Sequence, residues 1–300
     1  MAPKRIAVAI MSFDRPQYLT RILQNVVAQD PFIDASTTYF LFQDGSVSPR
    51  SGQVYGDQTA MDASVEAFRK YLPDGLVYQA RINLGVAMNF DRAERVLFEE
   101  NDFDAAIFLE DDMLLQPCYF RILEHLLQQS WDRQDIGMVS ARGFQNDTPL
   151  KEQRENAHRI CLMDEHNWAF AITRDAWKAR DEVLRPYLGK VADIDYRSRD
   201  QGNRKAALKM LQAGFARQGR GYLTSQDSMK NLAFELLGIN RITTFINNAR
   251  YIGVLGEHSN MEKFLARGYH RTVMYDQPHF DFELPSPDAL RHMRLGLRHR

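Results

Sequence analysis

Cysteine and long apolar runs are scarce in this 300-residue chain. Its two cysteines, Cys118 and Cys161, cannot form a disulfide framework or a four-cysteine metal site. We therefore expect a reducing compartment, the cytoplasm. The longest apolar runs, such as residues 6–11 and 105–109, are far shorter than the roughly 20 residues of a membrane-spanning helix. No cleavage-site pattern follows the first of them, so we expect no signal peptide.

A surplus of one charge sign is also missing. The chain has 38 Lys and Arg against 39 Asp and Glu, which gives a formal net charge of -1. Proteins that bind nucleic acid usually carry a basic surplus, so nucleic acid is not an expected partner. Apolar residues make up 44% of the chain and charged residues 26%, which is ordinary for a globular protein that buries a core.

The first part of the chain alternates short apolar segments with segments of helical periodicity. Strands are predicted at residues 6–11, 38–42, 77–80 and 105–109, and helices at residues 16–27, 64–71, 87–100 and 117–127. Short apolar strands joined by helical crossovers are typical of a mainly parallel sheet that carries helices on both faces. We therefore predict an α/β, Rossmann-like fold.

The second half is less regular. Strands are expected at residues 137–140 and 168–173 and within residues 250–256, and a helix is expected at residues 225–237. Residues 200–220 are polar, charged and rich in glycine, which indicates an exposed loop or a lid.

Polar segments follow three of the predicted strands. They are residues 12–15, 43–46 and 110–112. In open parallel sheets, ligands bind outside the carboxyl ends of the strands. If the sheet is parallel, all three segments lie on one rim, and this rim is the expected binding site.

Three consecutive carboxylates, Glu110, Asp111 and Asp112, end the fourth predicted strand. Strand geometry directs Glu110 and Asp112 to one face and Asp111 to the other. Carboxylates so close together repel each other unless a cation lies among them. Oxygen ligands suit Mg²⁺ or Mn²⁺, and phosphate oxygens complete such a shell. The alternative is a solvated acidic turn.

Four short motifs occur in a characteristic order: Ser-Phe-Asp-Arg-Pro, Gln-Asp-Gly-Ser, Asn-Leu-Gly and Phe-Leu-Glu-Asp-Asp-Met. Over residues 5–130 this order resembles the GT-A fold glycosyltransferases, above all the N-acetylglucosaminyltransferase I type, and more loosely family 2. The resemblance implies a metal-dependent, inverting transfer of a sugar from a nucleotide diphosphate donor, in the first place a UDP-sugar, to a hydroxyl of a glycan or glycolipid.

The resemblance also implies an organisation of the chain. Residues 1–130 would bind the nucleotide sugar. Residues 131–284 would bind the acceptor and supply the catalytic base within the same GT-A domain. Residues 285–300 form a basic C-terminal tail. Its arginines and leucines alternate as in an amphipathic helix, which suits contact with an anionic membrane or, alternatively, a solvated helix packed by its leucines.

Roles at the donor site follow from the matched motifs. The resemblance places Asp14 and Arg15 beside the nucleotide and lets Asp44 accept a hydrogen bond from the base. Arg81 and Asn83 would stand near the nucleotide and the donor sugar. Each of these residues has a structural alternative, such as a turn at Asp44 or an exposed ion pair at Arg81.

The resemblance places the metal on the last carboxylate, Asp112, and the ribose or sugar on Asp111. The metal would be Mn²⁺ or Mg²⁺. Glu110 replaces the Asp that usually opens this motif, as it does in the N-acetylglucosaminyltransferase I type. A late histidine is a further metal ligand in some GT-A enzymes, and His258 is the candidate here.

The catalytic base must take a proton from the acceptor hydroxyl. Asp227 opens a predicted helix, where the resemblance places the base, although an acidic residue in a first helical turn is also favoured by the helix dipole. Glu165 is the alternative base and a tentative acceptor residue. Trp168 is either a stacking surface for an acceptor sugar or a core residue.

Two other functions fit parts of the sequence. A sugar-nucleotide nucleotidyltransferase needs a glycine-rich phosphate loop directly after the first strand, and residues 12–16 contain no glycine. A non-catalytic nucleotide- or glycan-binding protein on the same fold would bind the nucleotide without turnover.

Overall fold

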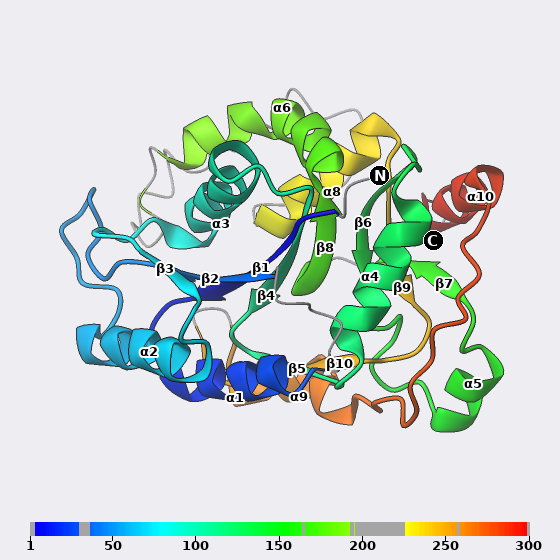
Figure 1. The fold of residues 1–300 in the computed structure, drawn as a ribbon, viewed down its shortest axis with the longest axis horizontal. Helices are drawn as coiled ribbons and strands as arrows, with labels where there is room; N and C mark the ends of the chain where they lie inside the picture. Colours follow the sequence, from blue (N-terminus) through cyan, green and yellow to red (C-terminus); the bar gives the residue numbers. More distant parts are fainter. Residues whose placement is uncertain are drawn as a thin grey trace.

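The computed structural model describes residues 4–29, 37–163, 166–192, 195, 226–256 and 259–298 (Figure 1). Within them an eight-stranded sheet has the order β3-β2-β1-β4-β8-β6-β9-β7, and β10 pairs with β5 separately. The strands are β1 (Ile6–Ser12), β2 (Thr38–Gln43), β3 (Leu76–Gln79), β4 (Ala105–Glu110), β5 (Met113–Leu115), β6 (Ile136–Ser140), β7 (Ile160–Leu162), β8 (Ala169–Thr173), β9 (Asn240–Thr244) and β10 (Ala249–Tyr251).

The first half of the sheet is parallel. β1 pairs in parallel with β2 and β4, and β2 pairs in parallel with β3. β6 and β9 are also parallel, whereas β8 is antiparallel to both β4 and β6, and β7 is antiparallel to β9. The predicted α/β fold with a mainly parallel sheet is therefore confirmed, and the four strands predicted in the first part of the chain are all present.

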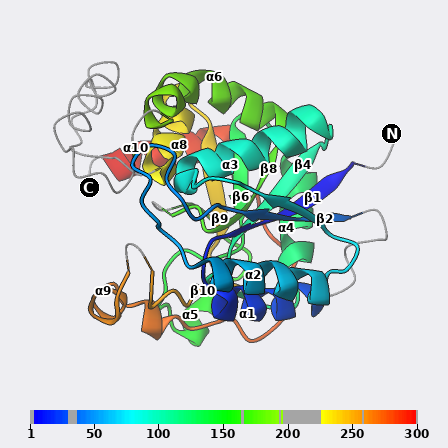
Figure 2. The ribbon, with the colours of Figure 1, turned by 90° about the vertical axis from the view of Figure 1, so that its left-hand side faces the viewer.

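Helices cover both faces of the sheet (Figures 1 and 2). The helices are α1 (Pro16–Val27), α2 (Gln58–Tyr71), α3 (Gly85–Arg95), α4 (Tyr119–Ser130), α5 (Leu150–Glu155), α6 (Arg174–Val191), α8 (Gln226–Leu237), α9 (Met261–Ala266) and α10 (Pro287–Arg298), with a π-helical turn η1 (Val96–Glu100) and a 3₁₀ turn η3 (Tyr269–Arg271). Figure 2 shows α1 and α2 below the sheet and α3 and α6 above it.

Side chains that alternate along the central strands form two apolar cores, one on each face of the sheet. In β1, Val8 and Ile10 pack with Leu19 of α1, whereas Ala9 packs on the opposite face with Phe90 of α3. Successive side chains of a strand point to opposite faces, so a fully apolar strand is stable only when both faces are covered. This explains why the run at residues 6–11 could be recognised as a buried strand.

α1 begins at Pro16, as predicted. Proline suits the first helical position because the amide hydrogen that it lacks has no partner within the helix. Buried residues recur at helical spacing and hold α1 against the sheet: Tyr18, Leu19, Ile22, Leu23 and Val26. The start of α1 therefore lies directly after the carboxyl end of β1, which places residues 12–15 at the rim.

The C-terminal helix predicted from residue 285 onward is present as α10. Leu290 is buried and Met293 packs against the main core. Contact of this helix with a membrane stays a prediction. Among the described residues, no helix combines the length and apolar character needed to cross a bilayer.

Candidate active site

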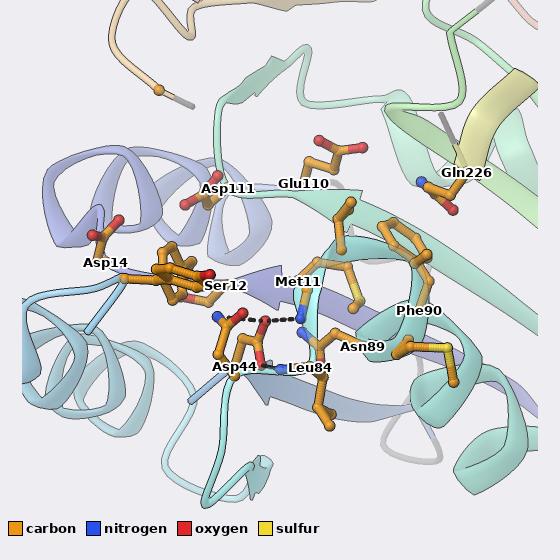
Figure 3. Close-up of a pocket in the computed structure, with 18 of the residues that line it drawn as sticks. Met11, Ser12, Asp14, Asp44, Leu84, Asn89, Phe90, Glu110, Asp111 and Gln226 are labelled. Carbon is orange, nitrogen blue, oxygen red and sulfur yellow. Dashed lines mark hydrogen bonds between the residues drawn. The ribbon is translucent and has the colours of Figure 1, made fainter. Parts of the chain in front are cut away.

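A cleft of about 1250 Å³ opens at the carboxyl ends of β1, β2 and β4. All three predicted polar segments line it, through Asp14 and Arg15, through Asp44, and through Glu110 to Asp112 (Figure 3). The expectation that these segments share one rim is thus confirmed by the strand directions and by the lining of the cleft. α8 supplies a further wall, with Gln226 and Asp227.

Arg15 is the cation that lies among the carboxylates. Its guanidinium forms an ion pair with Asp111 and a second one with Asp112, where Nη1 lies 2.8 Å from Oδ2. It also donates to the carbonyl oxygen of Leu255 at 3.2 Å. Both aspartates are only 3% exposed. The cluster therefore joins the start of α1 to the end of β4 and to the segment after β10.

Burial is the largest influence on the pKa values of Glu110 and Asp111. It raises the pKa of Asp111 to about 7, although Arg15 acts against the shift. Burial also raises the pKa of Glu110 well above its usual value, and the neighbouring Asp112 and Asp227 add to that rise. One guanidinium cannot fully neutralise two buried carboxylates, so the cluster has capacity for another positive charge or a proton.

Asp112 has the features of a metal ligand. Its Oδ1 atom is buried and accepts no hydrogen bond from the described residues. Gly253 packs so closely that a Cβ atom there would clash with Oδ2 of Asp112 and with the Tyr251 hydroxyl. The backbone amide of Ile252 donates to the Asp112 carbonyl oxygen at 2.8 Å. The site is therefore built closely around this one carboxylate.

The neighbouring acids do not complete a metal cage. Glu110 and Asp111 diverge from each other in the cleft (Figure 3). Within the described part of the chain, no three His, Cys, Asp or Glu side chains are grouped as metal ligands. Mg²⁺ and related cations are commonly held by one or two carboxylates together with substrate phosphates. The free oxygen of Asp112 fits such a site, provided that a phosphate ligand completes it.

Asp44 organises the rim. Oδ1 accepts hydrogen bonds from the backbone amides of Gly45 and Leu84, each at 2.8 Å, and Oδ2 accepts one from Gly85 at 3.0 Å. The Asn83 amide adds a bond of 3.4 Å. A carboxylate has about four acceptor positions, so these protein donors satisfy Asp44. Its clearest role in this structure is to hold the start of α3.

The other predicted donor-site residues are placed differently. Asp14 lines the cleft and is half-buried. Asn83 also lines it, but its amide is bonded to the Gly45 carbonyl oxygen at 2.9 Å. Arg81 is exposed and is not among the residues that line the cleft. The structure therefore brings Asp14, Asp44 and Asn83 together with Arg15, but it does not bring Arg81 to them.

Asp227 lies in the first turn of α8 and faces the same cleft. Burial raises its pKa, while Lys230 and hydrogen bonds from Asn167 act against the shift. The Gln226 side-chain amide donates to Oδ1 at 2.9 Å. Asp227 is thus a buried carboxylate with an increased affinity for protons, and it lies near Glu110 of β4.

A buried ion cluster anchors α8. Glu94 of α3 binds Lys230 of α8 at 2.8 Å and Arg180 of α6 at 2.5 Å. Burial favours the neutral form of Glu94, but the two cations outweigh it and lower its pKa. Lys230 follows Asp227 by nearly one helical turn, so the cluster fixes the helix from which Asp227 reaches the cleft.

Trp168 has no free face for a sugar. Its ring is stacked between His166, at 4.2 Å between centroids, and Tyr251, at 4.3 Å. Tyr269 meets it edge-on at 5.3 Å, and the tryptophan is 8% exposed. Of the two roles left open by the sequence, a sugar-stacking surface and a core residue, the burial of Trp168 agrees with the core role, and the tryptophan supports the wall of the cleft.

The aromatic partners of Trp168 were missed from the sequence. His166, Tyr251 and Tyr269 all line the cleft, yet Tyr251 and Tyr269 lie far from Trp168 in the sequence. Their only sequence signal is the richness of residues 251–275 in tyrosine. Glu165, His258 and the lid expected at residues 200–220 lie outside the described residues.

No family model and no curated protein matches the chain. Among solved structures, it is similar to the mannosyltransferase PcManGT from Pyrobaculum calidifontis in complex with GDP-Man and Mn²⁺. The identity is 13% and the TM-score 0.42, over 79% of this chain and 72% of that one.

Two further solved structures are also similar to the chain at low sequence identity. Glucosyl-3-phosphoglycerate synthase from Mycobacterium tuberculosis, in complex with Mn²⁺, UDP and phosphoglyceric acid, is 11% identical with a TM-score of 0.39, over 59% of this chain and 58% of that one. TarS from S. aureus is 11% identical with a TM-score of 0.44, over 87% of this chain. The chain spans 45% of the length of TarS.

Proposed function

We propose that this protein is a metal-dependent glycosyltransferase of the GT-A type. It would move a sugar from a nucleotide diphosphate donor, a UDP-sugar in the first instance, to a hydroxyl of a glycan or glycolipid. The observation that carries the proposal is the buried Asp112 oxygen without a partner, beside Arg15 and Asp111, at the carboxyl ends of parallel strands. The order of the rim motifs in the sequence supports it.

The donor would bind along the rim. Asp112 would hold Mn²⁺ or Mg²⁺, which neutralises the charge that develops on the leaving diphosphate. Arg15 would donate to the diphosphate, as a guanidinium matches pairs of phosphate oxygens. Asp111 would bind the ribose or the sugar, and Asp14 would lie beside the nucleotide. Asp44 with Asn83 would hold the segment that meets the base.

Asp227 would act as the base. Its carboxylate would take the proton from the acceptor hydroxyl while the hydroxyl oxygen attacks the anomeric carbon and the nucleoside diphosphate leaves. Attack from the side opposite the leaving group inverts the anomeric centre. Burial of Asp227 supports this role, because a carboxyl with a raised pKa holds an abstracted proton more readily.

Nucleotide binding tests the proposal most directly. Thermal unfolding is followed with UDP, GDP, CDP and TDP, each with and without Mn²⁺. One nucleotide with Mn²⁺ should stabilise the protein by about 2–3 kcal/mol at a hundredfold excess over its Kd. Asp112→Ala should abolish this stabilisation, whereas Asp62→Ala, which removes an exposed carboxylate of α2, should retain it. Equal stabilisation of both variants would count against the proposal.

The Arg15 ion pairs favour one alternative. Because a cation already lies between Asp111 and Asp112, the protein could bind a nucleotide sugar without a metal and without turnover. Two results together would favour a nucleotide-binding protein over a glycosyltransferase. The nucleotide would stabilise the protein equally with and without a chelator, and no donor would release its sugar.

A further inference from the structure

A second, smaller hollow adjoins the cleft. Its volume is about 220 Å³, and its lining residues are Phe144, Gln145, Asn146, Asp147, Arg267, Gly268 and Arg271. Arg267 lines the large cleft as well, so the two spaces meet at its side chain. Sites for whole ligands usually measure about 300–1000 Å³. The small hollow therefore suits one substituent of a molecule that lies in the cleft.

Two arginines give this hollow its charge. Arg267 follows α9, and its guanidinium makes no hydrogen bond or ion pair with the described residues. Arg271 is paired with Asp147 at 3.4 Å, but the two side chains are 60% and 53% exposed. Exposed ion pairs contribute little free energy, so an entering anion can compete with Asp147 for Arg271.

The backbone around the arginines is held in place. Gly268 has a φ of +70°, and a Cβ atom there would lie 2.6 Å from an Nη atom of Arg271. The tight turn therefore lets the Arg271 guanidinium lie against the backbone. Across the hollow, the buried Asn247 side chain donates to the Gln145 carbonyl oxygen at 2.8 Å. Both walls are thus preorganised, which lowers the entropic cost of binding.

We propose that this hollow is a subsite for an anionic group of the acceptor, a phosphate or a carboxylate. The proposal rests on the glycosyltransferase function proposed above. Arg267 and Arg271 would bind the anionic oxygens, because guanidinium groups pair with phosphates and carboxylates through two parallel hydrogen bonds. The reacting hydroxyl would extend past Arg267 into the large cleft. The acceptor is accordingly a phosphorylated or acidic sugar rather than a neutral one.

Inorganic phosphate and acetate test the subsite directly. The Nε–Hε signals of the arginines are followed by NMR in the full chain at constant ionic strength, and are assigned with Arg267→Gln and Arg271→Gln. We expect phosphate to shift both signals along one saturating curve. Loss of either arginine should weaken binding at the other about tenfold, as expected for a charge-assisted hydrogen bond. Tighter binding of phosphate than of acetate identifies a phosphorylated acceptor, and the reverse identifies an acidic sugar.

Two variants serve as controls. Lys263→Gln removes the same charge from exposed α9 without touching either space, and should leave the phosphate curve unchanged. Asp147→Asn removes the carboxylate that competes for Arg271, and should tighten phosphate binding. A phosphate curve that is equally weakened by Lys263→Gln, or signals that never saturate, would overturn the subsite.

The test of the anion subsite can succeed or fail independently of the test of the glycosyltransferase function. Asp112→Ala should leave the phosphate titration intact, because the subsite uses neither nucleotide nor metal. If the nucleotide and Mn²⁺ bind but phosphate does not, the subsite is wrong and the glycosyltransferase stands. If phosphate binds but no nucleotide does, the anion site stands and its assignment to an acceptor is wrong.

Discussion

At the scale of single residues, the site depends on how positive charge is shared. Arg15 pairs with two carboxylates that are almost completely buried. The carboxylates could be predicted from the sequence, because three acids end an apolar strand. Their pairing with Arg15 could not, because it joins positions 96 residues apart, and no local pattern encodes such a contact.

Removal of Arg15 should expose the repulsion between Asp111 and Asp112. We expect Arg15→Gln to lower the free energy of unfolding by about 3 kcal/mol, because it leaves two buried charges without a partner. Mn²⁺ should recover part of this loss, since Asp112 would then have a cation again. Chemical denaturation with and without Mn²⁺ measures both effects. Arg21→Gln, on the exposed side of α1, is the matched control; a similar loss in both variants argues against the cluster.

Asp111 should make the metal-free protein less stable as the pH rises. Burial raises its pKa to about 7 in the folded chain, whereas the same carboxyl titrates near about 4 in the unfolded chain. Between these values the folded state holds a proton that the unfolded state has lost, so stability falls with increasing pH. Over this window the wild type should lose stability relative to Asp111→Asn. A constant difference between the two proteins would contradict the assignment.

At the scale of elements, the parallel part of the sheet could be predicted and the antiparallel additions could not. β1, β2, β3 and β4 are marked by apolar runs between helical segments. β5 and β7 have only three residues each. Such short strands show no recognisable alternation of apolar and polar side chains. The direction of β8 depends on where the chain re-enters the sheet, and that choice is made by tertiary packing.

Glu94 is expected to be the residue that most strongly stabilises α8. Glu94→Gln leaves Lys230 and Arg180 buried without a negative partner, so the free energy of unfolding should fall by about 3–5 kcal/mol. Glu99→Gln removes a carboxylate from the same helical region. The Glu99 side chain, which pairs with Arg95, is 48% exposed, so the change should cost less than about 1 kcal/mol. Urea titrations compare the two. Equal losses would mean that the buried cluster does not anchor α8.

At the scale of the whole molecule, the cleft joins the two halves of the chain. The parallel strands supply the acids and Arg15, and α8, the segment after β10 and the region around α9 close the other side. The sequence located the first half of this site through its motifs. The aromatic wall and the arginines beyond it come from segments that the motifs do not cover, so only the folded chain brings them together.

In the proposed function, nucleotide binding and sugar transfer use residues from different halves of the chain, so mutations should separate the two. Asp227→Asn should keep nucleotide binding within about twofold and reduce sugar transfer by at least a hundredfold, a loss at the lower end of that expected for a general base. Asp288→Asn, on exposed α10, should change neither. Nucleotide binding and product formation are measured on the same preparations. Full transfer by Asp227→Asn would mean that another group takes the proton.

The ring stack at Trp168 allows tryptophan fluorescence to be used as a probe of the cleft. The chain has three tryptophans, and Trp168 is the one of them that lines the cleft in the described structure. Tyr251, which stacks on it, belongs to β10, and β10 pairs with the strand that directly follows Asp112. A rearrangement around that carboxylate should therefore alter the surroundings of the indole, and we expect tryptophan emission to follow events in the cleft without a label.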